Sequence, residues 1–118
     1  MNILITGASG FIGSRLTNLL TQIGHTISVL TSNPEYINSK VKIYPYDLLK
    51  NNNQIENAFT DVDVVIHLAS KVHYLSRIQN LEDYYQINVL GTKKLLDVAV
   101  KKKLKRFVYL SSIKVHGE

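Results

Sequence analysis

Short apolar runs alternate along the chain with longer segments in which apolar residues recur every three or four positions. A run of about four to eight apolar residues between turn signals is typical of a buried strand, and the wider spacing is typical of a helix. The runs predict five strands, over Asn2–Thr6, Thr26–Leu30, Val41–Tyr46, Asp63–Ala69 and Arg106–Ser111. The periodic segments predict three helices, from about Phe11 to Ile23, over Asn51–Phe59, and from Leu81 to about Lys102.

This alternation of strands and helices predicts an α/β fold. Strands that are apolar on both sides and separated by helices indicate a parallel sheet covered on both faces. Right-handed crossovers then favour a doubly wound sheet with strand order 3-2-1-4-5. In such a sheet the ligand crevice lies at the carboxyl ends of the strands, where the winding direction reverses. We therefore expect the crevice between the ends of the first and fourth strands.

Three glycines, Gly7, Gly10 and Gly13, separate the first strand from the first helix in MNILITGASGFIGSRL. Gly7 permits a tight turn, Gly10 lets the backbone approach a diphosphate, and Gly13 allows the helix and the strand to pack closely. The N–H groups near Phe11 and Ile12 would point at the bound anion from the positive end of the helix. A strand–helix turn without a ligand is the alternative, but three glycines in this context favour a dinucleotide site.

The composition is that of an ordinary globular domain. The chain has 118 residues, of which 45% are hydrophobic and 19% charged. Without an apolar run of about 18 residues or a leader before the first strand, we expect no membrane span, no signal peptide and a cytoplasmic location. The absence of cysteine excludes disulfides and thiolate metal sites.

Much of the net charge of +5 lies in KKKLKR at Lys101–Arg106. This cluster ends a predicted helix, where cations complement the helix dipole and remain solvated. A nucleic-acid patch is the alternative, but neither interleaved aromatic residues nor a recognisable module supports it. We expect no nucleic-acid partner.

The spacing Thr-Gly-x-x-Gly-x-x-Gly in TGASGFIG resembles the fingerprint of the extended short-chain dehydrogenase/reductase family, which contains the NAD-dependent nucleotide-sugar epimerases and dehydratases. Four further segments resemble family motifs in family order: YPYDLL at Tyr44–Leu49, DVDVVIHLAS at Asp61–Ser70, YYQINVLGTKKLLDVAV at Tyr84–Val100 and RFVYLSSIKVHGE at Arg106–Glu118. The resemblance covers nearly the whole chain. It implies a Rossmann-like fold, NAD as the cofactor and a nucleotide sugar as the substrate of the full-length enzyme.

The resemblance also implies roles for individual residues. Asp47 would contact the adenine, and the strand that ends near Ala69 would run beneath the nicotinamide ribose. Ser112 matches the catalytic Ser/Thr that hydrogen-bonds the reacting sugar oxygen; a strand-end hydroxyl bonded to local backbone is the alternative. The expected cofactor-binding residues are Gly7, Ser9, Gly10, Phe11, Ile12, Gly13, Thr31, Asp47, Leu48, Leu68, Ala69, Asn88 and Ser111.

One face of the long predicted helix carries Asn88, Gly91, Leu95 and Val98, which recur every three or four residues. Three of the four are apolar or minimal, so this face is expected against the sheet, and Gly91 would allow close approach. A buried Asn88 needs hydrogen-bond partners. The resemblance implies that it braces the cofactor-side backbone, and plain satisfaction within the core is an equal alternative.

The histidines and the basic loop residues are expected to have ordinary roles. His67 interrupts an apolar strand and is interpreted as a core residue, because no further ligand stands at metal-binding spacing. His73 is interpreted as a surface residue, with substrate contact as the alternative. Lys71 and Arg77 in the same loop are expected to be solvated, with contact to a nucleotide-sugar diphosphate as the alternative.

Two departures from the family pattern stand out. The family's Tyr-x-x-x-Lys acid/base pair would lie beyond Glu118, and Tyr36-x-x-x-Lys40 is interpreted as a coincidence. Residues 1–118 are thus expected to form a single dinucleotide-binding domain, without the substrate domain and inactive alone. Thr31 and Ser32 stand about where an acidic residue would read the NAD ribose, and no Arg is positioned there for the 2′-phosphate of NADP. The choice between NAD and NADP therefore stays open, with NAD favoured.

The favoured function is the cofactor half of a nucleotide-sugar epimerase, dehydratase or reductase. In the full-length enzyme a hydride would leave the sugar carbon for the nicotinamide. A non-catalytic dinucleotide sensor or scaffold is one alternative, and the cofactor half of a hydroxysteroid or dihydroflavonol reductase is another. The segment SSIKVHGE favours an enzyme, and the family suggests a homodimer formed through the helix over Leu81–Lys102.

Overall fold

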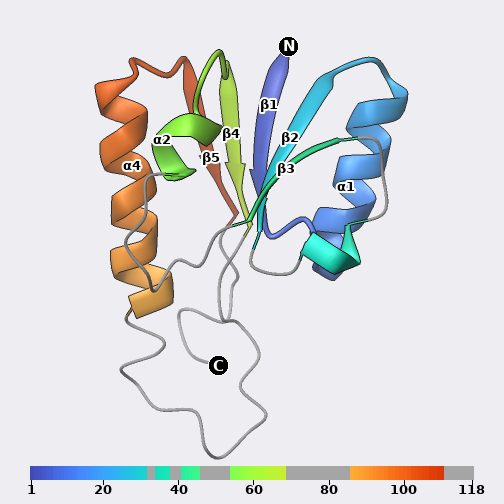
Figure 1. The fold of residues 1–118 in the computed structure, drawn as a ribbon, viewed down its shortest axis with the longest axis horizontal. Coiled ribbons are helices and arrows are strands. Elements are labelled where there is room, and N and C mark those ends of the chain that lie inside the picture. The colour runs from blue at the N-terminus through green and yellow to red at the C-terminus, as the bar shows by residue number, and fades with distance from the viewer. Residues whose placement is uncertain (32–33, 38–40, 46–53, 69–85, 111–118) are drawn as a thin grey trace, which may run out of the picture.

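A computed structural model of the chain describes residues 1–31, 34–37, 41–45, 54–68 and 86–110. Its strands are β1 (Asn2–Thr6), β2 (Thr26–Thr31), β3 (Lys42–Pro45), β4 (Val64–His67) and β5 (Arg106–Tyr109). Its helices are α1 (Phe11–Gln22), α2 (Gln54–Ala58) and α4 (Thr92–Lys101), with a 3₁₀ turn η1 (Pro34–Tyr36) and a π-helical turn η2 (Gln86–Gly91). Figure 1 shows the strands side by side between α1 and the pair α2 and α4.

The five described strands form one parallel sheet in the order β3-β2-β1-β4-β5. The predicted strand order is confirmed. Ile5 of β1 stands beside Val29 of β2 on one side and Ile66 of β4 on the other. The winding direction therefore reverses between β1 and β4, and the carboxyl ends of these strands lie at the predicted crevice.

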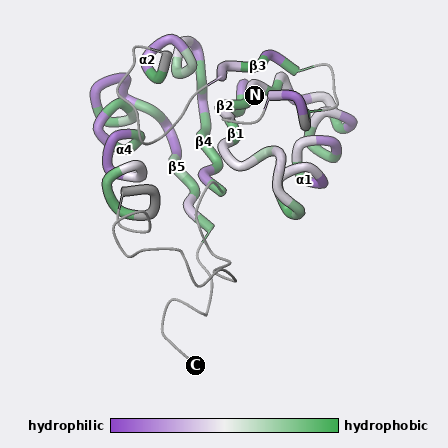
Figure 2. The backbone as a smooth tube through the Cα atoms, turned by 60° about the horizontal axis from the view of Figure 1, so that its bottom comes forward, coloured by the Kyte–Doolittle hydropathy of each residue, from purple (hydrophilic) through white to green (hydrophobic). Residues whose placement is uncertain are grey.

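Two hydrophobic clusters cover the two faces of the sheet. Leu4 belongs to the cluster that includes Leu95 of α4 and residues of α2, whereas Ile3 and Ile5 belong to the cluster with Leu20 of α1. Neighbouring residues of a strand point to opposite faces, which explains why β1 is apolar at consecutive positions. Figure 2 shows α1 and α4 alternating between hydrophilic and hydrophobic colour along their turns, as expected for helices with one buried face.

Part of the long predicted helix has a different geometry. The helix predicted from Leu81 to about Lys102 is confirmed over its described part, where the π-helical turn η2 (Gln86–Gly91) leads directly into α4 at Thr92. Residues 81–85 lie outside the described residues. A single turn with i→i+5 hydrogen bonds is too short for apolar periodicity to distinguish it from an α-helical turn. The predicted inward face of α4 is confirmed, since Leu95 is buried and Val98 packs against the same cluster.

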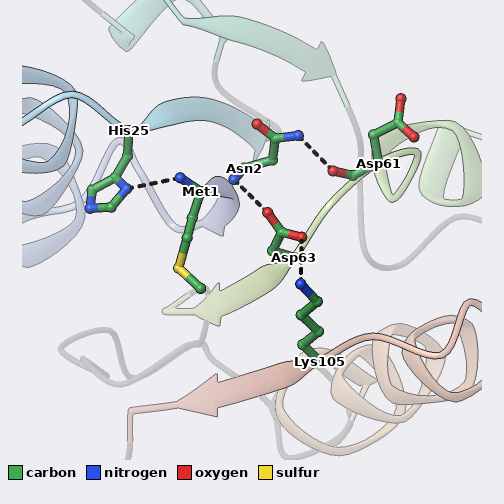
Figure 3. A network of polar contacts seen from close by, with 6 residues as sticks. All are labelled: Met1, Asn2, His25, Asp61, Asp63 and Lys105. Atoms are coloured by element: carbon green, nitrogen blue, oxygen red, sulfur yellow. Dashed lines mark hydrogen bonds and ion pairs between the residues drawn. The ribbon is translucent and has the colours of Figure 1, made fainter.

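Polar contacts join β1, β4 and β5 at the amino ends of the strands (Figure 3). The backbone N–H of Asn2 donates to Asp63 Oδ2 at 2.9 Å, and its side-chain amide donates to the carbonyl of Asp61 at 2.8 Å. Lys105 Nζ lies 3.7 Å from Asp63 Oδ1. The hydrogen bond from Asn2, aided by Lys105, holds the pKa of the Asp63 carboxyl below its usual value.

Candidate functional site

The turn between β1 and α1 is built on Gly7 and Gly10. Gly7 has φ of +77°, a left-handed conformation that side chains with a Cβ rarely adopt. Its carbonyl accepts a hydrogen bond from the N–H of Gly10 at 3.1 Å, and the carbonyl of Gly10 accepts one from Ser14 at 2.9 Å. The sequence-based interpretation of Gly7 as a tight-turn residue is confirmed.

Gly13 lets α1 lie directly against this turn. A Cβ at Gly13 would lie 1.9 Å from the carbonyl oxygen of Gly7 and 2.9 Å from Cα of Ala8. These neighbours are backbone atoms and cannot rotate away. The expected close approach of the helix is confirmed, but its nearest neighbour is the turn that follows β1 rather than the strand itself.

Gly10 stands in a different environment. A Cβ there would approach only the Gly7 carbonyl, at 3.4 Å, among the described neighbours within 4 Å. The backbone of Gly10, with φ −80° and ψ 177°, is extended and open to any residue. Internal packing in the described part of the chain therefore gives no reason for glycine at this position. A ligand that approaches the backbone closely would give one.

The first turn of α1 leaves hydrogen-bond donors at the same place. Among the described residues no side chain caps this helix, and its first turn has no acidic residue. The first N–H groups of a helix have no partner within the helix and lie at its positive end. Phe11 and Ile12 are exposed, and the Arg15 guanidinium lies 4.4 Å from the centre of the Phe11 ring. Helix geometry thus offers an anion site beside Gly10.

His67 lies in the core beside the carboxyl end of β1, beneath the expected crevice. It is fully buried at the end of β4. Its Nδ1 lies 2.6 Å from Thr6 Oγ1, and its Nε2 lies 2.8 Å from Thr92 Oγ1. The ring stacks on Tyr109 with centroids 5.5 Å apart. Burial lowers the pKa of His67 to about 4, so the imidazole is neutral at pH 7. Its interpretation as a satisfied core residue is confirmed.

The remaining predicted site residues fall into two groups. Leu68 lies beside β1, and its N–H is held by the Thr6 carbonyl at 3.1 Å and by Thr6 Oγ1 at 3.0 Å. Thr31 is buried at the end of β2, Ser9 is partly buried in the glycine turn, and Asn88 belongs to η2. The other predicted positions lie outside the described residues: Lys40, Asp47, Leu48, Ala69, Lys71, His73, Arg77, Ser111 and Ser112.

Sequence reasoning did not single out Thr6 or Thr92. Thr6 ends an apolar run and pairs in register with His67, which is 61 positions away. The strand order predicted from the sequence places β1 beside β4, but the register that pairs Thr6 with His67 comes only from the structure. The contact of Thr92 depends on how α4 begins, and the sequence carries no signal for that. In the described ranges no group of three or more acidic or histidine side chains is arranged to hold a metal ion, and no helix there is long and apolar enough to span a membrane.

The chain is similar in sequence and in structure to enzymes named for nucleotide sugars. The chain is 37% identical, over an alignment of 147 residues, to dTDP-glucose 4,6-dehydratase of Haemophilus influenzae; this covers all of the chain and 41% of that protein. Among solved structures it is similar to MoeE5 in complex with UDP-glucuronic acid and NAD, with a TM-score of 0.87 and 28% identity, covering 99% of this chain and 38% of that one. For the UDP-glucose 4-epimerase of Thermus thermophilus in complex with NAD, the TM-score is 0.84, the identity 25% and the coverage 95% and 38%.

The chain thus spans less than half the length of these relatives. The profile of the NAD-dependent epimerase/dehydratase family matches residues 3–118, a range that runs from β1 through the glycine turn and the segments around β4 and α4. Sequence motifs, strand order, the glycine turn and relatives agree, and the chain belongs to the NAD-dependent epimerase/dehydratase family.

Proposed function

We propose that residues 1–118 form the dinucleotide-binding domain of an NAD-dependent enzyme that epimerises, dehydrates or reduces a nucleotide sugar. The observation that carries the proposal is the environment of Gly10. Among the described residues a Cβ at Gly10 would only touch the Gly7 carbonyl oxygen, at 3.4 Å. Gly10 also follows a turn that needs glycine at Gly7, and it precedes a helix without a side-chain cap. All three features lie where the sheet reverses its winding between β1 and β4.

The described residues fit a dinucleotide in this crevice. The N–H groups of Phe11, Ile12 and Gly13 would bind the pyrophosphate, with Ser9 beside them and with Gly10 allowing close approach. Thr31 ends β2 on one side of β1, and Leu68 directly follows β4 on the other. From the family motifs we extend the proposed contacts to positions whose side chains lie outside the described part: Asp47, Leu48, Ala69, Asn88 and Ser111.

NAD is the proposed cofactor because the family is NAD-dependent and similar solved structures hold NAD. When bound, NAD would accept a hydride from a carbon of the sugar. We propose that the Ser112 hydroxyl hydrogen-bonds the reacting sugar oxygen and holds it in place. The names of the relatives support a nucleotide sugar as substrate. On the family resemblance, a homodimer formed through the helix predicted over Leu81–Lys102 is also part of the proposal.

Calorimetric titration of the 118-residue chain with NAD and with NADP tests the proposal. Gly10→Val should weaken NAD binding at least tenfold, because its side chain would stand where the pyrophosphate approaches. The unfolding free energy should fall by no more than about 1 kcal/mol, since valine accepts the extended backbone and is only a poor helix cap.

Gly24→Ala is the matched control. Gly24 has φ of +101° and lies after α1, away from the crevice, so alanine there strains the backbone. This variant should be less stable than wild type and should bind NAD with unchanged affinity. Wild-type NAD affinity in Gly10→Val would mean that the glycine serves only the turn, and the proposal would then be wrong.

A further inference from the structure

A layer of polar side chains lies at the carboxyl end of the buried face between the sheet and α4. Deeper on this face Leu4, Val65 and Leu95 pack together. Two residues further along β1 and β4 the pair changes to Thr6 and His67. One turn nearer the start of α4, Leu95 gives way to Thr92, which is the third member of the layer.

The hydrogen bonds of this layer are demanding in geometry. A neutral imidazole has one donor and one acceptor nitrogen, and both nitrogens of His67 are within 2.8 Å of a threonine hydroxyl. Apolar side chains would fill the same space and tolerate small displacements. A fully buried polar group instead needs its partners at bonding distance, because an unmet hydrogen bond is costly there. His67 therefore fixes the separation between β1 and the first turn of α4.

Each member of the layer adjoins a segment of the proposed dinucleotide site. Thr6 immediately precedes the turn that begins at Gly7. His67 immediately precedes Leu68, whose N–H is bonded to both Thr6 oxygens. Thr92 immediately follows η2. The layer thus holds together the three segments that border the crevice from β1, β4 and α4.

We propose that His67 is a positioning residue for the dinucleotide site: by bridging Thr6 and Thr92 it fixes the glycine turn and Leu68 relative to the start of α4. The proposal rests on the proposed function, since it takes this crevice as the place where NAD binds. His67 is buried beneath the crevice and acts through its neighbours.

Thr92→Val tests the bridge without touching a proposed cofactor contact. Valine keeps the shape of threonine but removes the hydroxyl that meets His67 Nε2. The NAD dissociation constant should rise about fivefold, the equivalent of one net hydrogen bond. In the ligand-free chain the amide NMR signals of Gly7 and Leu68 should shift, although both residues are far from position 92 in sequence. Thr92→Ser, which restores the hydroxyl, should return both the affinity and the signals toward wild type.

A double-variant cycle isolates the role of His67. In a His67→Phe background the bridge is already lost, so adding Thr92→Val should move neither the Gly7 signal nor the NAD affinity further. Equal effects of Thr92→Val in both backgrounds would overturn the proposal. His25→Gln, just before β2 at the amino ends of the strands, is the histidine control and should leave the NAD affinity and the Gly7 signal unchanged.

The measurements separate failure of this proposal from failure of the proposed function. A wild-type chain that does not bind NAD contradicts the proposed function, and the bridge is then judged on the ligand-free signals. If Thr92→Val lowers the melting temperature while the signals of Gly7 and Leu68 stay at their wild-type positions, His67 only fills the core and the positioning role is refuted.

Discussion

The two ends of the sheet hold polar networks of opposite character. At the amino ends of β1, β4 and β5, Asp63 and Lys105 form an ion pair whose side chains are 30% and 74% exposed. At the carboxyl ends, Thr6, His67 and Thr92 meet without formal charge, and His67 is fully buried. Water and salt screen the first network. The second is shielded from both at Thr6 and His67, which are buried, and partly shielded at Thr92, so its geometry is held more strictly.

The two networks therefore differ in role: the exposed one only joins strand ends, whereas the buried one would position the backbone beneath the proposed cofactor site. The exposed network joins the amino ends of the strands, where no cofactor contact is proposed. A small displacement of these side chains costs little free energy. The buried network adjoins the glycine turn, because Thr6 directly precedes Gly7. A displacement of Thr6 would therefore also move the backbone groups that are proposed to bind the pyrophosphate. Substitutions should therefore have large effects at the carboxyl end and small effects at the amino end.

The largest expected effect comes from Gly13→Ala. The new Cβ would lie 1.9 Å from the Gly7 carbonyl oxygen, so α1 or the turn must move. We expect a loss of about 3 kcal/mol or more in the free energy of unfolding, measured by urea denaturation.

Gly10→Ala is the paired control, since its Cβ would be 3.4 Å from the same oxygen, and it should cost no more than about 1 kcal/mol. Similar losses for the two variants would contradict the close packing of α1 on the turn.

As the pH is lowered, the free energy of unfolding should fall first through His67, at the carboxyl end of the sheet. The pKa of His67 is about 4 in the folded chain and has a reference value of 6.5, so the unfolded state binds a proton that the folded state does not. Stability is complete above pH 6.5 and falls as the pH drops from 6.5 toward 4, by about 3 kcal/mol at the lower limit. Urea unfolding at a series of pH values measures this slope.

His67→Gln removes the titrating group, and its stability profile should be flat between pH 6.5 and 4 relative to wild type. A slope that persists in this variant would assign the effect to other groups. Asp63 has a lowered pKa and therefore acts in a lower window: its contribution is present above the reference value of 3.8 and is lost as the pH falls through the folded pKa.

Asp63→Asn should have a smaller effect on stability than Gly13→Ala or the protonation of His67. The amide oxygen of asparagine can still accept the hydrogen bond from the Asn2 N–H, and only the charge is lost. A slight decrease in stability at low salt, which disappears at high salt, is expected in thermal unfolding. A loss as large as that of Gly13→Ala would refute the contrast between the two ends.

Lys105→Ala should have the smallest effect of the series. Its Nζ lies 3.7 Å from the Asp63 carboxylate and its side chain is mostly exposed, and such pairs contribute little. The melting temperature should stay within measurement error of wild type, with Lys93→Ala as a control on another exposed ion pair. A clear decrease in Lys105→Ala alone would show that the amino-end network fastens the sheet more firmly than its exposure suggests.

Much of the fold could be predicted because each strand has a local signal. Runs such as the one over Asn2–Thr6 are apolar at consecutive positions only when both faces are covered, and the single handedness of crossovers leaves few strand orders. The π-helical geometry of Gln86–Gly91 could not be predicted, since one turn is too short for its period to be distinguished from that of an α-helix. Cofactor contacts at positions such as Asp47 and Ser112 rest on the family resemblance, because these residues lie outside the described part of the structure.

The sequence by itself determined the parallel sheet, its order and the glycine turn at its reversal point, because apolar periodicity and the conformational freedom of glycine act over a few neighbouring residues. Only the tertiary structure decided that Gly13 packs on the turn rather than on the strand, and that a Cβ at Gly10 would touch only the Gly7 carbonyl among the described residues. It alone joined His67 to Thr6 and Thr92, which are 61 and 25 positions away. A hydrogen bond requires two groups to be close in space. Local sequence patterns cannot predict such a pair between residues distant in the chain before the register of strands and helices is known.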